Sequence, residues 1–230
     1  LSKMNVIRSQ NSLYHKVKYA SESDLENAIL EVQRELFGIN RLYLDVKRKI
    51  GAKDGLRNIP DGYLIDLYGN TPRLYVVENE LESHDPLRHI AVQILQFSLS
   101  FESEPRIVKN ILFDTIQQTP EYQNRCENYA LTHGYRNLDH MLEWLVFESP
   151  FAALVIIDEM PDKLESILAR KFQFGVEVLE LKRFENEHKE RLYYFEPFLA
   201  DVTPGLSNYV ETDHAVDLGL IDTVVVPARN

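Results

Sequence analysis

The spacing of apolar residues predicts that helices and strands alternate along the chain. Between positions 21 and 37 apolar residues recur every three or four positions, at Leu25, Ile29, Val32 and Leu36. This period is typical of one buried helix face. The helix is expected to start at Ser21 or Ser23, where Ser23 and Glu26 form a Ser-x-x-Glu capping pattern, and Gly38 predicts its end.

Three segments with strand-like patterns follow this helix. They cover residues 42–50, 62–68 and 73–81, and the glycine-containing loop between the first two carries Lys53 and Arg57. The sequence Tyr-Gly-Asn-Thr-Pro between the second and third segments is typical of a turn. We therefore expect these two segments to form a hairpin.

The second half of the chain is predicted to be mainly helical and then to return to strands. Asp85-Pro86 is typical of a helix start, and residues 105–148 have a helical pattern interrupted at Pro120 and Gly134. The remaining predicted elements are a buried strand at 151–157, a helix at 162–172, and strands at 176–181 and 192–195. This order indicates an α/β protein with a helical insertion and extra C-terminal strands.

The chain is expected to contain one main domain. Residues 1–199 carry the predicted α/β elements, whereas residues 200–222 are acidic and loop-like and residues 222–228 are again apolar. Residues 200–230 are interpreted as a C-terminal extension that could begin a further segment.

The net charge, the cysteine content and the length of the apolar runs make some classes of protein function less suitable for this chain. The formal net charge of −11 counts against a protein that coats nucleic acid, which usually has a basic surface. Cys126 is the only cysteine, so no internal disulfide can form, and this favours a reducing compartment. No apolar run is long enough for a membrane span and no signal-peptide pattern is seen at the N-terminus. We expect a cytoplasmic protein without a membrane partner.

Acidic residues in the predicted hairpin are the strongest candidates for chemistry. Glu78 and Glu80 lie two positions apart in one strand, so both side chains project from the same face. Like charges at that spacing repel, and a shared divalent cation relieves the repulsion. Asp61 precedes the other strand and can lie opposite Glu78 if each strand has about seven residues.

Two simpler interpretations of the same residues stay open. Pro60-Asp61-Gly62 is also a common turn sequence, and Glu78-Asn79-Glu80 can be a solvated strand end. Their spacing, together with the elements on either side, favours convergence of the three carboxylates on a metal ion.

The run Ile59-Pro60-Asp61, followed by residues 75–80 (Tyr-Val-Val-Glu-Asn-Glu), resembles the PD-(D/E)xK nuclease superfamily. The resemblance covers roughly residues 21–197 and implies an αβββαβ core with a mixed central sheet, as in restriction-endonuclease-like proteins. Gln93 and Phe97, in the helix after the motif, are similar to a Gln and an aromatic residue of the RecB-like branch.

The resemblance implies a nuclease that hydrolyses DNA phosphodiester bonds with Mg²⁺ or Mn²⁺. Asp61 and Glu78 would bind the metal, Gln93 would contact a phosphate or orient the hairpin, and Glu80 would accept a proton or bind a second ion. The family usually has Lys where this chain has Glu80, and this departure is compatible with an active enzyme or with lost activity.

Glu26 has two interpretations. The family's first helix often supplies a Glu to the metal shell, and Glu26 is the candidate, with Glu22 less favoured. Glu26 would otherwise cap its own helix together with Ser23.

Two alternatives to an active nuclease follow from these patterns. The chain would be an inactive module of the same fold that binds DNA or protein, or an acidic interaction protein of unrelated α/β fold. A homodimer is compatible with a nuclease that cuts both strands. Lys53, Arg57 and Arg88 are candidates for phosphate contacts by their position in the sequence alone.

Overall fold

The structure is a computed structural model of the 230-residue chain. It describes residues 5–9, 12–46, 60–84, 86–161, 174–199 and 224–227, together with Leu164, Leu168 and Phe172. No helix in the described part of the chain is long and apolar enough to cross a membrane.

The described strands form two five-stranded sheets. The first, which we call the mixed sheet, contains β3 (Arg41–Asp45), β4 (Gly62–Asp66), β5 (Arg73–Glu80), β6 (Ala152–Ile157) and β7 (Val176–Glu180) in that order. Strands β3, β4 and β5 pair antiparallel, whereas β5, β6 and β7 pair parallel. The second, which we call the antiparallel sheet, contains β1 (Val6–Ser9), β2 (Ser12–Val17), β8 (Lys182–Glu185), β9 (Arg191–Phe195) and β10 (Val224–Pro227).

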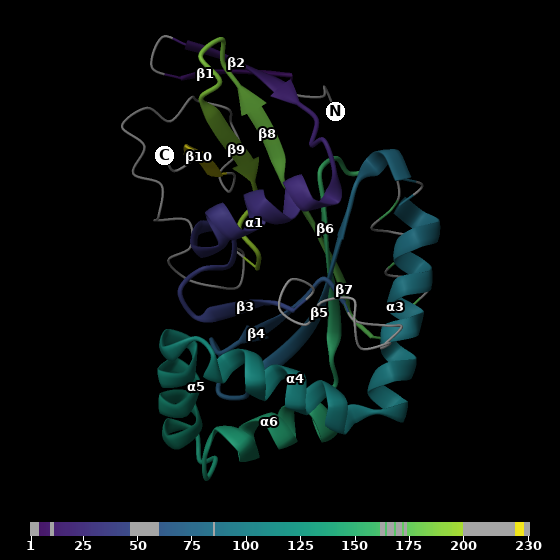
Figure 1. The fold of residues 1–230 in the computed structure, drawn as a ribbon, viewed down its shortest axis with the longest axis vertical. Coiled ribbons are helices and arrows are strands. Elements are labelled where there is room, and N and C mark those ends of the chain that lie inside the picture. Colours follow the sequence, from purple (N-terminus) through teal and green to yellow (C-terminus); the bar gives the residue numbers. More distant parts are fainter. Residues whose placement is uncertain are drawn as a thin grey trace.

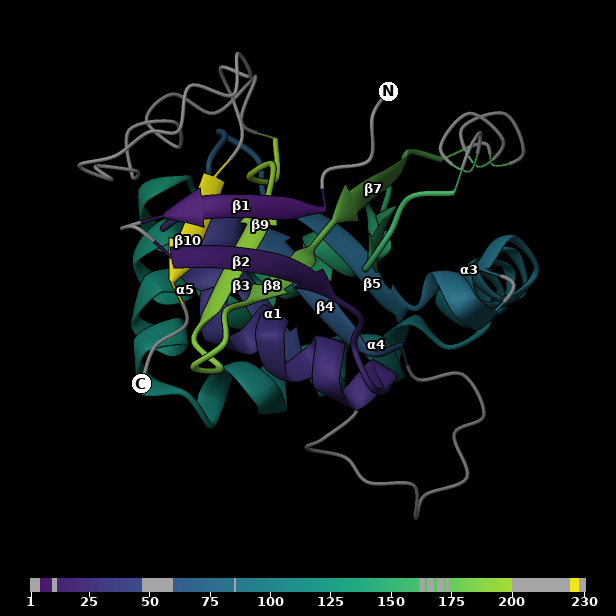
Figure 2. The same ribbon diagram turned by 90° about the horizontal axis from the view of Figure 1, so that it is seen from above.

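Helix α1 (Glu22–Phe37) lies between the two sheets, above the mixed sheet and below the antiparallel sheet in Figure 1. The view from above shows the same stacking (Figure 2). The apolar stripe of α1 is fully buried, as the spacing predicted, against residues of both sheets that include Leu64, Leu154 and Tyr193. Packing of this stripe against both sheets is the main source of stability for α1, because tertiary packing stabilises helices in proteins more than intrinsic helix propensity does.

Four helices cover the opposite face of the mixed sheet. They are α3 (Pro86–Ser103), α4 (Pro105–Gln117), α5 (Pro120–Thr132) and α6 (Leu138–Phe147). Ile90 and Ile94 of α3 pack on β6, and the buried residues of α4, α5 and α6 pack on β3, β4 and β5. The helical insertion and its breaks at Pro120 and Gly134 are therefore confirmed.

The order of helix, three strands, helices and a buried parallel strand agrees with the predicted α/β class. Strand β6 lies between β5 and β7 and is buried from Ala153 to Ile157, as expected for the apolar run. The extra C-terminal strands are present, and β7, β8 and β9 follow one another closely.

The structure decides one predicted boundary and adds elements that were not predicted. Of the two predicted starts of α1, Ser21 is the N-cap, and its Oγ accepts a hydrogen bond from the Asp24 N–H at 3.3 Å. Strand β8 and the pairing of β1 with β2 were not predicted. The short charged segment Lys182–Glu185 has no clear apolar pattern, and only pairing with both β2 and β9 makes it a strand.

Several predictions fall outside the described residues. They include most of the predicted helix at 162–172, although Leu164 and Leu168 are buried in the core. The loop that carries Lys53 and Arg57 also lies outside. Of the predicted C-terminal extension, residues 224–227 are described, and they pair with β9 as the edge strand of the antiparallel sheet.

Candidate functional site

The pairing of β4 with β5 places Asp61 next to Glu78. Gly62 is paired with Val77, so the residue before Gly62 faces the residue after Val77 in an antiparallel ladder. The Oδ2 atom of Asp61 accepts a hydrogen bond from the Asn79 N–H at 2.9 Å, which holds the carboxylate against β5.

Gly62 shows why Pro60-Asp61-Gly62 is more than a surface turn. A Cβ atom at Gly62 would lie 2.9 Å from the Leu44 carbonyl oxygen and 2.9 Å from the ring of Tyr43. Only glycine lets β3 and β4 approach this closely, and the strand begins directly after Asp61. Asp61 is therefore buried to 7% exposure at the start of a strand, not placed at an exposed turn.

Glu78 and Glu80 are buried on the face of the mixed sheet that α3 to α6 cover. They alternate with Val77 and Asn79, and Val76 on the same face packs with the helical cluster. Their exposed fractions are 8% and 3%, so the interpretation of these residues as a solvated strand end is wrong.

Asn79 points the other way, toward α1. Its Nδ2 donates a hydrogen bond to the Tyr43 hydroxyl at 3.4 Å, and its Oδ1 is buried without a hydrogen-bond partner. The negative charges of Asp61 and Glu26 both act on Tyr43 and help to raise the pKa of its hydroxyl, after burial, which is the main cause. Glu26, on α1, is thus close enough to Tyr43 for its charge to act on the hydroxyl.

Glu80 is surrounded by histidines and a second glutamate. Its Oε1 lies 3.3 Å from His84 Nδ1, and its Oε2 lies 3.4 Å from His89 Nδ1. His84 belongs to the short 3-10 helix η1 (Glu82–His84), and the same Nδ1 atom is 3.2 Å from Glu22 Oε1 at the start of α1. The Leu81 N–H also donates to Glu80 Oε1 at 2.9 Å.

These surroundings raise the pKa of the Glu80 carboxyl above its ordinary value. Burial is the largest cause, and the negative charge of Glu22 adds to it. The hydrogen bond from Leu81 and the two histidines oppose the increase without cancelling it. A carboxyl group with a raised pKa is better suited to accept a proton than an ordinary glutamate.

The ligand group that the structure brings together differs from the one that the sequence predicted. Within the described ranges, three potential metal ligands have donor atoms that all lie within 4.8 Å of one another. They are Glu22, Glu80 and His84. Asp61, Glu78 and Glu26 are not members of this group. Metal binding by Asp61, Glu78 and Glu26 remains a prediction.

The sequence favoured Glu26 over Glu22, which lies one turn earlier in the predicted helix. With Ser21 as the cap, Glu22 becomes the first helical residue and lies at the end of α1 that meets Glu80. Glu22 and Glu26 are four positions apart and share one side of the helix. The four-residue spacing between Glu22 and Glu26 could have indicated Glu22 as a second candidate ligand. The position of the N-cap, which decides where the helix starts, was not fixed by the sequence.

Asp158 is an acidic neighbour that the sequence did not single out. It follows β6, and β5 runs parallel to β6 with Glu80 paired to Ile157. Its Oδ1 accepts a hydrogen bond from the Glu82 N–H at 2.8 Å, and burial raises the pKa of its carboxyl. The parallel register, which no sequence pattern specifies, brings it to this edge.

The remaining predicted site residues are less well defined. Gln93 is half-buried on α3, one turn after His89, and therefore on the side of the helix that faces Glu80. Lys53 and Arg57 and the side chain of Arg88 are outside the described part.

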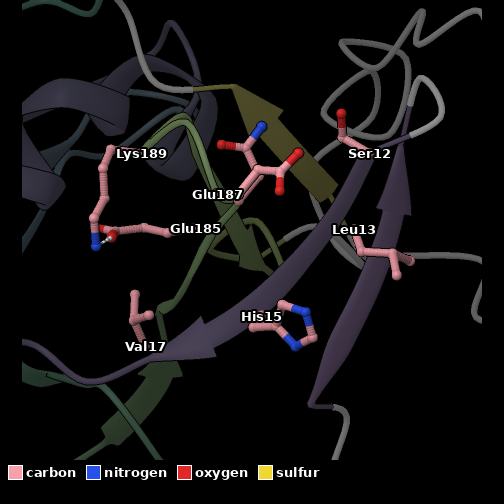
Figure 3. Close-up of a pocket in the computed structure, with 8 residues that line it drawn as sticks. Ser12, Leu13, His15, Val17, Glu185, Glu187 and Lys189 are labelled. Atoms are coloured by element: carbon pink, nitrogen blue, oxygen red, sulfur yellow. Dashed lines mark hydrogen bonds and ion pairs between the residues drawn. The ribbon is translucent and has the colours of Figure 1, made fainter.

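A separate cavity of about 510 Å³ lies on the antiparallel sheet (Figure 3). Ser12, His15 and Val17 of β2 line one side, and Glu185, Glu187 and Lys189 line the other. Lys189 and Glu185, on this second side, form an ion pair at 3.4 Å. None of the predicted site residues lines this cavity, and the cluster around Glu80 has the denser set of potential ligands.

No family model, no curated protein and no solved structure matches this chain.

Proposed function

We propose that this protein is a divalent-metal-dependent nuclease with a PD-(D/E)xK-like core that hydrolyses DNA phosphodiester bonds. One observation carries the proposal: Asp61, Glu78 and Glu80 are all buried at the same end of the β4–β5 hairpin, and Glu22 of the preceding helix reaches this end. The order of one helix, three antiparallel strands, helices and a parallel strand supports it.

The chemistry of the donor set fits a hard divalent cation. Carboxylate oxygens are the preferred ligands of Mg²⁺ and suit Mn²⁺, and two or more buried carboxylates side by side favour a shared cation. Asp61 and Glu78 would hold this ion, with Glu26 of α1 as a candidate further ligand. The ion supplies charge that polarises a phosphate and lowers the pKa of a water.

The protein's own groups would then position and deprotonate the nucleophile. Glu80, whose pKa is raised, accepts a proton from the attacking water or holds a second ion. The Asn79 N–H fixes the orientation of Asp61. Gln93, on the flank of α3, contacts the phosphate backbone. Lys53, Arg57 and Arg88, assigned by their position in the sequence alone, would neutralise phosphates of the DNA, which the overall net charge of −11 does not favour.

The test is cleavage of supercoiled plasmid and of single-stranded DNA by the metal-free protein after addition of Mg²⁺ or Mn²⁺, with EDTA as the blank. Cleavage that depends on either metal and is lost in Glu78→Gln supports the proposal. The matched control is Glu177→Gln, which alters an exposed carboxylate on β7 of the same sheet. Equal cleavage by wild type and Glu78→Gln would refute the assignment.

A second candidate is an inactive module of the same fold that binds DNA or protein. One observation favours it: this chain has Glu80 at the position where the PD-(D/E)xK family, which it resembles, usually has Lys. Calorimetric titration with Mn²⁺ separates the two, because an inactive site that has lost its ligand geometry binds Mn²⁺ weakly or not at all. Absence of both Mn²⁺ binding and cleavage would favour this module over the nuclease.

A further inference from the structure

The cluster of Glu22, Glu80 and His84 has a geometry of its own, beside the pair Asp61 and Glu78. Its three members come from the start of α1, the end of β5 and the 3-10 helix η1. Their donor atoms lie within 4.8 Å of one another, and His84 Nδ1 is 3.2 Å from Glu22 Oε1 and 3.3 Å from Glu80 Oε1.

These separations are similar to the distances between two ligand atoms that bind the same metal ion. Two ligands that bind one small divalent ion at about 2.0–2.2 Å, with tetrahedral or octahedral angles between them, are about 3.0–3.5 Å apart. Two of the separations in the cluster are within this range. A small adjustment of side chains would therefore admit an ion among the three groups.

The composition of the cluster indicates which metal. Mg²⁺ takes oxygen ligands almost exclusively, whereas an imidazole nitrogen suits Zn²⁺, Ni²⁺, Fe²⁺ and related first-row transition metals. A cluster of two carboxylates and one imidazole therefore favours a transition-metal ion over Mg²⁺.

His89 provides a second, independent observation. It lies on α3 and contacts the other oxygen of Glu80, at 3.4 Å, while Glu80 itself is 3% exposed. Carboxylates that bind a metal are commonly held in place by a hydrogen bond to the oxygen that does not bind. The position of His89 is the one that such an orienting residue would occupy.

We propose that Glu22, Glu80 and His84 bind a divalent first-row transition-metal ion in preference to Mg²⁺, and that His89 orients Glu80. The proposal rests on the proposed function only in treating this ion as a second metal beside the one assigned to Asp61 and Glu78. It assigns Glu80 to metal binding, which is one of the two roles considered above.

The test uses Co²⁺ as the probe and measures binding without any cleavage assay. Metal-free Asp61→Asn, in which the neighbouring ion site is weakened, is titrated with Co²⁺ and followed by visible absorption and by calorimetry. One equivalent is expected to bind, with a spectrum that shows nitrogen ligation. In the same background, His84→Gln and Glu22→Gln should each lower the affinity for Co²⁺ by about tenfold or more.

Controls make the outcome specific to the cluster. His188→Gln alters a histidine that is 71% exposed and remote from Glu80, and it should leave the affinity for Co²⁺ unchanged. His84 is itself 43% exposed, so its substitution leaves the core intact, which circular dichroism will verify. A large excess of Mg²⁺ should displace little of the Co²⁺.

Unchanged affinity for Co²⁺ in both His84→Gln and Glu22→Gln would overturn the proposal, as would ready displacement by Mg²⁺. Either result leaves the nuclease proposal standing, because that proposal is judged by cleavage and by Glu78→Gln. Conversely, Co²⁺ binding that depends on His84 would stand even if the protein cleaves no DNA.

Discussion

The two ends of the β4–β5 hairpin bury carboxylates in opposite ways. At the end that carries the turn, Asp66 is 6% exposed and its Oδ2 is 3.2 Å from the Arg41 Nε. Arg41 also donates to the carbonyl oxygens of Phe37 and Phe198, at 3.1 Å each. At the open end, Asp61, Glu78 and Glu80 are also buried, and the described neighbours of Glu80 are two histidines and a further carboxylate.

The difference separates a structural carboxylate from a candidate functional one. Asp66 has a permanent cation fixed by its own hydrogen bonds, so the folded chain needs nothing else there. At the open end, burial and the negative charge of Glu22 raise the pKa of the Glu80 carboxyl, and perturbed carboxyl groups of this kind are typical of functional sites. The two ends therefore respond differently to substitution, and four predictions follow from the contrast.

The largest expected effect is on catalysis at the open end. Asp61→Asn and Glu78→Gln should each lower metal-dependent cleavage by about a thousandfold or more, because they remove ligands of the ion that stabilises the transition state. The metal-free variants should be as stable as wild type or more stable, since one repelling charge is lost. Cleavage rates and urea denaturation in EDTA measure both. A variant that retains cleavage would show that the substituted carboxylate is not a metal ligand. A variant that unfolds would show that the carboxylate is structural, like Asp66.

The next effect is on stability at the turn end. Arg41→Met should lower the free energy of unfolding by about 3–5 kcal/mol, because it leaves Asp66 buried without its cation. The double variant with Asp66→Asn should recover part of this loss. Urea denaturation of the single and double variants measures the coupling, and a loss below about 1 kcal/mol would show that the pair is not structural.

A pH-dependent effect is expected from Asp158, at the edge beside Glu80. Because its pKa is raised in the folded protein, the folded state binds more protons than the unfolded chain between the ordinary value of 3.8 and the raised value. Stability contributed by this group is therefore lost as pH rises through that window. Asp158→Asn should stabilise the protein near neutral pH and have less effect below the window.

The measurement for Asp158→Asn is urea denaturation across the acidic range, with EDTA present. The variant keeps an oxygen that can accept the hydrogen bond from the Glu82 N–H, so the difference reports the charge. Glu177→Gln, at an exposed position on β7, is the control. A gain in stability that is independent of pH would contradict the electrostatic explanation.

The smallest expected effect concerns the helix start that positions Glu22. Ser21→Ala should lower the free energy of unfolding by about 1 kcal/mol, because the Ser21 side chain accepts the hydrogen bond from the Asp24 N–H. Ser23→Ala, at the position that the sequence favoured as the cap, should have a smaller effect. Thermal denaturation of the two variants decides between the cap positions, and a larger effect at Ser23 would reverse the assignment.

Much of the fold could be predicted from local patterns. The periodicity of α1, the turn of the hairpin and the helix break at Pro120 are properties of short segments, and the structure confirms them. Strand β8 was missed because its four residues are mostly charged and become a strand only through two neighbours that are distant in sequence.

The positions of the candidate site residues could be predicted only where those residues lie in one local element. Asp61, Glu78 and Glu80 lie within one hairpin, so strand alternation and register suffice to place them together. Glu22 reaches Glu80 through packing of α1, and Asp158 reaches the same edge of the sheet, where it contacts Glu82, through the parallel pairing of β5 with β6. Neither contact leaves a signal in the spacing of residues, because both depend on how separate elements meet.

Anomalous X-ray scattering from crystals soaked in Mn²⁺ tests most directly whether Asp61 and Glu78 bind a metal ion. We expect an anomalous peak within about 2.5 Å of carboxylate oxygens of both Asp61 and Glu78. The same peak should be absent from crystals of Glu78→Gln. Soaked wild-type crystals without an ion at this end of the hairpin would contradict the assignment of Asp61 and Glu78 as a metal centre.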